Sequence, residues 1–469
     1  MVGESSTVEV LPEDVLLEIF DFYKLTSTTL LWGWHKLSHV CRRWRCIVFA
    51  SQCRLGLQLL CTYETPVKKT IDCWPTIPIV VSNRGNVKTH RMTSPEAEDS
   101  IVTALQHRDR VCEIDLALVL GSLSEKVFKI MQESFPLLES LALRSCDSTL
   151  ALPSTFLGGF TPRLRVLHLD FMSSRALPLL LSSACDLVDL QLERIPSTGF
   201  ISPEVFAASL SSMTRLKTLR LAFASPTSHL GSRCTPPSSS GLVVLPTLTN
   251  FTFRGSCDYL EDFLSRIDTP SLARARIGFF HQPDFNVLQL AHFLGRTEPQ
   301  RLPDGGKLLL HKDGISLALG RPGVLVLPAD ASHAPEWLRL FISFGQSDFN
   351  MSLMTQICQQ ISPFLSSVRN LDVTTVSPEN EVNPVQWLDL FRVFSSVEKL
   401  HVTWGLVPNV ARALQLVSAE IAVRVLPALR ELKFDWAATR WRDAVASFID
   451  ARGLAGLPVI EFHQPKASG

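Results

Sequence analysis

The sequence predicts an α/β fold, with a short N-terminal helical module followed by an irregular solenoid of short parallel strands that alternate with helices. Two observations lead to this prediction. Residues 10–50 carry apolar side chains at helical spacing, and most of the remaining chain repeats an apolar-x-x-apolar-x-apolar pattern. A single unit of that pattern cannot bury its apolar face alone, so successive units are expected to stack.

Composition limits the classes of function. The chain has 469 residues, of which 46% are hydrophobic, so it exceeds one ordinary domain unless the excess is a repeat array. Lys plus Arg and Asp plus Glu are 45 each, so no net positive charge favours nucleic acid or an anionic membrane as a partner.

Compartment is indicated by the N-terminus and the cysteines. We expect an intracellular protein, cytoplasmic or nuclear, because there is no signal-like N-terminus and no apolar run of membrane-spanning length. The 11 cysteines contain no C-x-x-C pair, which indicates free thiols in a reducing compartment.

Three short helices are predicted in the N-terminal module. Pro12 suits the first turn of a helix, and Glu13 and Asp14 suit its positive end. Apolar residues then recur at steps of three and four in three segments: Val15, Leu16, Ile19, Phe20 and Tyr23; Leu30, Leu31, Trp34 and Leu37; Val40, Cys41, Trp44, Ile47 and Val48. Helices this short bury little surface alone, so the module needs a partner.

The same segment resembles an F-box, through Leu11, Pro12, Ile19, Val40 and Trp44. The resemblance implies contact with a Skp-type adaptor, and through it a cullin ligase. The residues it assigns to that contact are Leu11, Pro12, Ile19, Phe20, Val40, Cys41 and Trp44. The interval from Ile19 to Val40 is longer than the family pattern, and it contains a bulky stretch at 31–35 that could reshape the docking surface.

Two other interpretations of this segment remain open. One is a helical hairpin that caps the following domain. The other is a zinc site formed by His35, His39, Cys41 and Cys46. Their spacing is not that of a known zinc finger, and Cys41 already has a packing role, so no metal or cofactor is expected.

Domain boundaries follow from changes in pattern. We expect an F-box at 8–55, a proline-rich connector at 56–100 and a repeat domain at 101–463. Within the connector, Ile79-Val80-Val81 is predicted to form a strand, and a helix is predicted to begin near Ser94-Pro95.

Regular spacing and recurrent prolines distinguish the repeats from chance matches to the apolar pattern. Clear copies begin at Leu138, Leu164, Leu187, Leu216, Leu248, Val397 and Leu429, and weaker copies at Val111, Leu272, Val368 and Leu457. Where clear copies are adjacent they lie 23 to 32 residues apart, near the leucine-rich-repeat period. Five copies carry a proline two positions before the first apolar residue, which we expect to end the preceding helix: Pro136, Pro162, Pro246, Pro270 and Pro427.

The pattern fails between residues 300 and 345. Residues 307–319 predict a hairpin whose turn is Asp313-Gly314, a pair that tolerates two positive φ angles. Residues 324–327 and 337–342 predict further strands of the same sheet. The whole arrangement resembles fungal F-box proteins with degenerate leucine-rich repeats, which implies an irregular leucine-rich-repeat solenoid.

Residues between the apolar positions of each strand are expected on the concave face of such a solenoid. Early strands place carboxylates there, namely Glu113, Asp115, Asp170, Asp189 and Glu193. Middle strands place Arg220, Arg254, Arg274 and Arg276 there. One hypothesis is a binding face for a partner of complementary charge, and the alternative is an ordinary solvated sheet surface.

Function is predicted from these parts together. No P-loop, dinucleotide fingerprint, nucleophile elbow or H-E-x-x-H motif occurs, so no catalytic residues are expected and the protein is not expected to be an enzyme. The F-box resemblance implies a substrate-recognition adaptor of a Skp–cullin–F-box ubiquitin ligase, whose repeats bind an unknown protein target. The alternative is a leucine-rich-repeat interaction scaffold without a ligase role.

Overall fold

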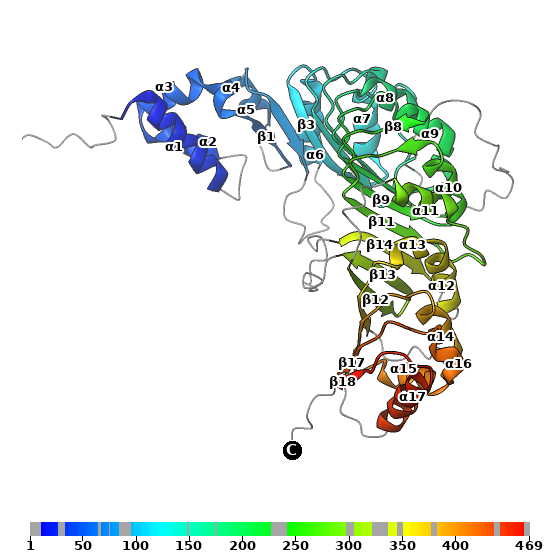
Figure 1. The fold of residues 1–469 in the computed structure, drawn as a ribbon. Coiled ribbons are helices and arrows are strands. Elements are labelled where there is room, and N and C mark those ends of the chain that lie inside the picture. Colours follow the sequence, from blue (N-terminus) through cyan, green and yellow to red (C-terminus); the bar gives the residue numbers. More distant parts are fainter. Residues whose placement is uncertain are drawn as a thin grey trace, which may run out of the picture. The chain divides into compact units, whose positions relative to one another are not determined.

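Short strands alternate with helices along most of the chain, as the repeat pattern predicts (Figure 1). The computed structural model describes residues 11–26, 33–63, 67–74, 76–83, 95–147, 150–173, 176–226, 242–296, 304–320, 336–344, 350–376, 382–435 and 441–463. They belong to two units, unit 1 (Met1–Leu187) and unit 2 (Val188–Gly469).

Unit 1 opens with four helices: α1 (Glu13–Thr26), α2 (Gly33–Val40), α3 (Arg42–Ala50) and α4 (Gln52–Leu55). A parallel sheet follows in the order β1 (Leu59–Cys61), β2 (Ile79–Ser82), β3 (Val111–Leu118), β4 (Ser140–Ser145) and β5 (Val166–Asp170). The connecting helices are α5 (Val67–Cys73), α6 (Pro95–Gln106), α7 (Ser122–Ile130), the 3₁₀ turn η2 (Phe156–Gly159) and α8 (Leu177–Ser183).

Two expectations for unit 1 change. Val40 ends α2 instead of opening the third helix, because Cys41 has an extended backbone and its Sγ accepts a hydrogen bond from the Trp44 N–H at 3.4 Å, which caps α3. The range 56–100, expected as a connector, contains β1, α5 and β2, so the sheet begins before residue 101. The predicted strand at 79–81 and the helix starting near Pro95 are both present.

Unit 2 contains a sheet in the order β6-β7-β9-β11-β14-β13-β12-β15-β16-β17-β18. Its strands are β6 (Asp189–Ile195), β7 (Thr218–Phe223), β9 (Asn250–Gly255), β11 (Arg274–Phe279), β12 (Gly305–His311), β13 (Gly314–Gly320), β14 (Glu336–Ser343), β15 (Asn370–Thr375), β16 (Lys399–Val402), β17 (Glu431–Phe434) and β18 (Glu461–His463). A separate two-stranded sheet pairs β8 (Val243–Val244) with β10 (Ile267–Asp268).

Helices of unit 2 lie on one side of its sheet (Figure 1). They are η3 (Ser197–Gly199), α9 (Pro203–Ser209), α10 (Cys257–Leu264), α11 (Leu288–Gly295), α12 (Met351–Gln360), α13 (Ser362–Leu365), α14 (Pro384–Phe391), α15 (Val407–Gln415), α16 (Ala419–Ala422) and α17 (Arg442–Leu454). Strand residues therefore alternate between a buried face under the helices and a face that no helix covers, which we call the open face. In β7, Leu219 and Leu221 are buried, whereas Arg220 between them lies on the open face.

The prolines of the repeat act through turns. In each of the five copies, the N–H of the first apolar residue donates to the carbonyl three residues earlier, as from Leu138 to Phe135 at 3.2 Å and from Leu429 to Leu426 at 3.1 Å. Proline is thus the second residue of a β-turn, a position that its fixed φ suits. Copies without proline make the same bond, as Leu216 does to Met213, so proline reinforces a turn that the repeat forms anyway.

The interruption at 300–345 is a hairpin inserted into the parallel sheet. β13 runs antiparallel to both β12 and β14, while β12 and β14 pair in parallel with β15 and β11 on the outer sides. The loop is Lys312-Asp313, and Gly314 already pairs with His311, so the predicted Asp-Gly turn is displaced by one residue. Residues 324–327, predicted as a strand, lie outside the described residues.

Glycine is needed at position 314 because there is no room for a side chain, and not because the backbone has a positive φ. A Cβ on this residue would lie 2.5 Å from the Ile342 carbonyl oxygen and 2.7 Å from the Phe341 ring. Because β14 passes this close, a side chain at 314 would have to push the strand away.

Substitutions at two glycines of unit 2 should therefore differ in their effect on stability. Gly314→Ala should lower the free energy of unfolding by about 1–3 kcal/mol, the usual cost of overpacking. Gly453→Ala in α17, where a Cβ meets nothing within 4 Å, should leave it unchanged or raise it slightly. Urea denaturation of both variants measures the difference, and equal stability of the two would contradict the close approach of β14.

Candidate functional site

Helix α1 carries apolar side chains on two faces. Leu16, Leu17 and Phe20 are buried, with at most 4% of their surfaces exposed. Val15, Ile19 and Phe22, which follow each other at steps of four and three, are 42%, 42% and 69% exposed. A helix needs only one apolar face to pack on its own domain, so the second face is available to a partner.

Side chains from α3 and α4 hold α1 in place. The Phe20 and Trp44 rings meet edge to face, with their centroids 4.8 Å apart. The Arg43 guanidinium donates to the Leu11 carbonyl at 2.5 Å, which ties down the start of the helix. Arg54 pairs with Glu18 at 2.7 Å. These contacts fix the outward direction of Val15 and Ile19.

The structure divides the predicted adaptor-contact residues between surface and core. Pro12, Ile19, Val40 and Cys41 are exposed, and Leu11 and Trp44 are half-buried. Phe20 is 1% exposed, so it supports the surface from inside.

Val15 and Phe22 were missed as surface residues. Their steps of four and three from Ile19 could have indicated them. We call the exposed residues Pro12, Val15, Ile19, Phe22 and Val40 the apolar surface of the helical domain.

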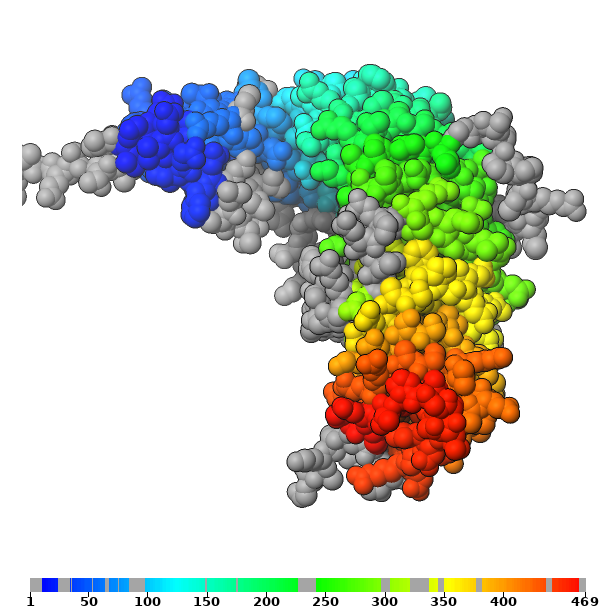
Figure 2. All heavy atoms as spheres, viewed as in Figure 1, coloured from blue at the N-terminus to red at the C-terminus, as the bar shows by residue number. Residues whose placement is uncertain are grey.

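An aromatic cluster joins the helices to the first part of the sheet in unit 1. Trp34 contacts Trp74 edge to face at 5.7 Å, and Phe49 stacks on Trp74 at 4.7 Å. The Trp34 indole N–H also donates to the Gln58 carbonyl at 3.0 Å, next to β1. In the space-filling view the helical residues, drawn in dark blue, continue without a gap into the lighter blue residues that follow (Figure 2). The helical domain is therefore built onto the sheet through these rings.

Comparison with known proteins agrees with this geometry. Residues 8–52 match the model of the F-box-like family. F-box domains generally bind Skp-type adaptors, and the apolar surface lies within the matched segment. The match covers the helical domain only, and a comparison with curated proteins found no match.

Several solved structures match the chain. One of them is the leucine-rich repeat-containing protein LegL7 from Legionella pneumophila, with 11% identity, a TM-score of 0.28, and coverage of 71% of this chain and 97% of that one. At this TM-score the match adds nothing to the description of the strands and helices given above. An F-box-like domain followed by repeated strand–helix units is typical of non-enzymatic interaction proteins.

Potentially reactive groups among the described residues include three buried cysteines and the side chains that could hold a metal ion. Burial raises the pKa of the Cys61, Cys257 and Cys358 thiols to about 12, which keeps them protonated and unreactive. In the described part of the chain, no three His, Cys, Asp or Glu side chains are grouped to hold a metal ion. The His35 side chain of the alternative zinc site lies outside that part. None of the helices described there has the length and apolar character needed to cross a membrane.

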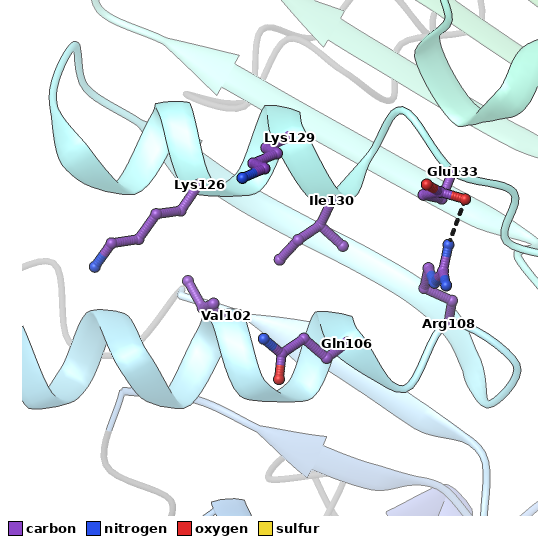
Figure 3. A pocket seen from close by; sticks show the side chains of 7 residues that line it. All are labelled: Val102, Gln106, Arg108, Lys126, Lys129, Ile130 and Glu133. Carbon is purple, nitrogen blue, oxygen red and sulfur yellow. Dashed lines mark ion pairs between the residues drawn. The ribbon is translucent and has the colours of Figure 1, made fainter.

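A groove on the helix side of unit 1 lies between α6 and α7 (Figure 3). It has a volume of about 390 Å³ and is lined by Val102, Gln106, Arg108, Lys126, Lys129, Ile130 and Glu133. Arg108 pairs with Glu133 at 2.8 Å, and Lys126 with Asp99 at 3.6 Å. The described lining contains no Ser, Cys or Thr nucleophile beside a His base.

On the open face of unit 1, the predicted carboxylates are partly neutralised. Asp115 on β3 pairs with Arg144 on β4 at 2.5 Å. Burial, together with the nearby Asp115 carboxylate, raises the pKa of Glu113. This part of the face is therefore less acidic than the sequence alone indicates.

The predicted arginines of unit 2 differ in their partners. Arg220 on β7 pairs with Glu193 at 2.5 Å. The Arg254 guanidinium on β9 lies 5.4 Å from the centre of the Phe280 ring. Arg254 and Arg274 are exposed, and Arg276 is half-buried on the same face of β11.

Strands β15 to β17 carry a histidine between two carboxylates on the open face. His401 Nδ1 lies 3.2 Å from Asp372 Oδ1, and its Nε2 lies 2.8 Å from Asp435 Oδ1. The hydrogen bond with Asp372 raises the pKa of His401, Asp435 adds to this, and partial burial opposes it. Lys399 pairs with Glu431 at 2.7 Å nearby, so charges on these strands are matched within the sheet.

His401 should make stability depend on pH. Its pKa is raised in the folded protein, so its contribution is complete below the unfolded value of about 6.5 and is lost as pH rises through the folded value. His401→Gln should therefore destabilise the protein more at about pH 5.5 than at about pH 8.5. Urea denaturation at both pH values measures this. The matched change at His292, an exposed histidine on α11 without a carboxylate partner among the described residues, should not show this dependence.

Proposed function

We propose that this protein is a substrate-recognition adaptor of a Skp–cullin–F-box ubiquitin ligase, acting in the cytoplasm or nucleus. The helical domain docks the Skp-type subunit, which connects to the cullin. The repeats hold a protein target, and ubiquitin transfer takes place on other subunits. The observation that carries the proposal is the second apolar face of α1, on the segment that matches the F-box-like family.

The apolar surface suits adaptor docking in its chemistry. Ile19 and Val40 come from different helices and are 42% and 59% exposed, so covering them removes apolar area from water. Burying a fully exposed side chain of this kind contributes about 1.5–3 kcal/mol. Leu11 and Trp44 are half-buried and Cys41 is exposed, and Phe20 packs against Trp44 from the buried side of α1. We assign the docking role to these residues together with Pro12.

The repeat domain supplies the second half of the proposal. Its open face presents polar and charged side chains on a continuous sheet within each unit, which suits recognition of another protein. The alternative, a repeat scaffold without a ligase role, would use the same sheet but would not need the adaptor.

Capture by a purified Skp-type adaptor separates the two functions. The full-length protein should be retained, and the double variant Ile19→Asp/Val40→Asp should lose about tenfold or more in affinity, because two charges would be buried against the adaptor. Leu179→Asp on α8, which is 69% exposed, is the matched control and should bind normally. Circular dichroism of the variants checks that they fold.

Absence of any association between the wild-type protein and the adaptor would reject the ligase role and leave the scaffold function. Equal loss of binding in the Leu179→Asp control would show that the effect does not come from the apolar surface.

A further inference from the structure

Basic side chains are concentrated on the open face of four neighbouring strands in unit 2. Arg220 on β7, Thr252 on β9, Arg276 on β11 and Arg339 on β14 are in register, so they form one row across the sheet. Neighbouring strands lie about 4.8 Å apart, so the three steps of this row span about 14 Å. Arg274 and Arg254 lie on the same face, two residues before and after the row.

Among the described side chains of these four strands, none on that face is acidic. The open-face positions of β7 are Thr218, Arg220 and Ala222. Those of β9, β11 and β14 follow the same alternation: Asn250, Thr252 and Arg254; Arg274, Arg276 and Gly278; Arg339, Phe341 and Ser343. Five of these twelve residues are arginines, so positive charge dominates this surface.

Elsewhere on the open face, basic groups are matched within the sheet. Arg144 pairs with Asp115 in unit 1, and Lys399 pairs with Glu431 in unit 2. Arg220, at the end of the row, pairs with Glu193. Arg254 and Arg274 have no carboxylate partner among the described residues, and both are exposed. A protein that leaves two guanidinium groups without a counter-charge there has them available to an external anion.

The surroundings of Arg254 favour a fixed contact. Its guanidinium lies 5.4 Å from the centre of the Phe280 ring, which restricts the side chain before binding. In register beside it, Gly278 has no side chain, and the next strand presents Phe341. A ligand could therefore approach the sheet backbone at Gly278, between the Arg254 side chain and the Phe341 ring. An extended peptide has the shape to fit there.

We infer that this arginine row docks an extended segment of a target protein that is rich in Asp and Glu. The inference rests on the proposed function and names the chemistry of its target. Because the guanidinium groups are spread over about 14 Å instead of converging on one point, several carboxylates fit them better than a single phosphate. Protein is favoured over nucleic acid because the whole chain has no net charge and other strands present carboxylates on the same face.

Fluorescence anisotropy of labelled peptides tests this with the full-length protein. The probe is a twelve-residue peptide that alternates Glu with Gly, and its Gln-for-Glu counterpart is the neutral control. The wild-type protein should bind the acidic peptide and not the neutral one. The double variant Arg254→Glu/Arg274→Glu should weaken binding by about tenfold or more, since two charge-assisted contacts become repulsive.

A matched variant controls for net charge. Arg412→Glu/Arg424→Glu makes the same charge change at exposed positions on and next to the helices α15 and α16, and it should bind the acidic peptide as the wild type does. Equal weakening in both double variants would show a non-specific charge effect and overturn the inference.

Other outcomes also decide the question. No binding of the acidic peptide by the wild type, tighter binding of a neutral peptide with one phosphoserine, or tighter binding of a single-stranded RNA of equal charge would each overturn it. Adaptor capture by the Arg254→Glu/Arg274→Glu variant should be unchanged. If the wild type binds the peptide but not the adaptor, the ligase role fails and the arginine row stands.

Discussion

Burial of one apolar face per element is the constraint on which the rest of the structure depends. A strand of four to six residues presents two or three apolar side chains to the helices, and none of them would be shielded from water in an isolated unit. In β7 and β9, Leu219, Leu221, Phe251 and Phe253 reach 0–2% exposure because the neighbouring strands and α10 cover them. Each unit of the repeat is therefore stabilised by the next. The helical domain obeys the same constraint, since its apolar core is small and Trp34 and Phe49 pack on Trp74 beyond it.

This constraint explains why the strands could be predicted from the sequence. All eleven apolar-x-x-apolar-x-apolar copies lead into a strand, including the weaker ones at Val111, Leu272, Val368 and Leu457. The first apolar residue of a copy, such as Leu164 or Leu248, is fully buried and closes a turn, so it is needed for packing and for chain direction at once. Because this residue has two roles, an apolar side chain recurs at its position in every copy and can be recognised in the sequence. The proline before it has a single, local role, which explains why only some copies carry it.

Features set by contacts between distant parts of the chain could not be predicted in the same way. The close approach of β14 to Gly314 depends on a strand more than twenty residues later, so the sequence indicated a hairpin but placed its turn one residue too far along. Arg452 is a second example, because it is 1% exposed and donates to the carbonyls of Leu426, Pro427 and Leu429 at 2.8–3.1 Å. A buried arginine in a helix gives no sequence signal of such partners. The outward direction of Ile19 and the inward direction of Phe20 likewise depend on where α3 places Trp44.

Charge on the open face follows a different rule from packing. None of the described helices covers these positions, so packing in the core does not constrain their residues. Matched pairs such as Lys399 with Glu431 cost the fold little. Repulsion between arginines on neighbouring strands works against such a row, because strands at about 4.8 Å hold the charges close. Folding alone does not require Arg254 and Arg274 to lie there without a counter-charge. Their position is explained if another protein supplies the negative charge. The exposed apolar face of α1 is explained in the same way, since a partner would cover what the fold itself leaves exposed.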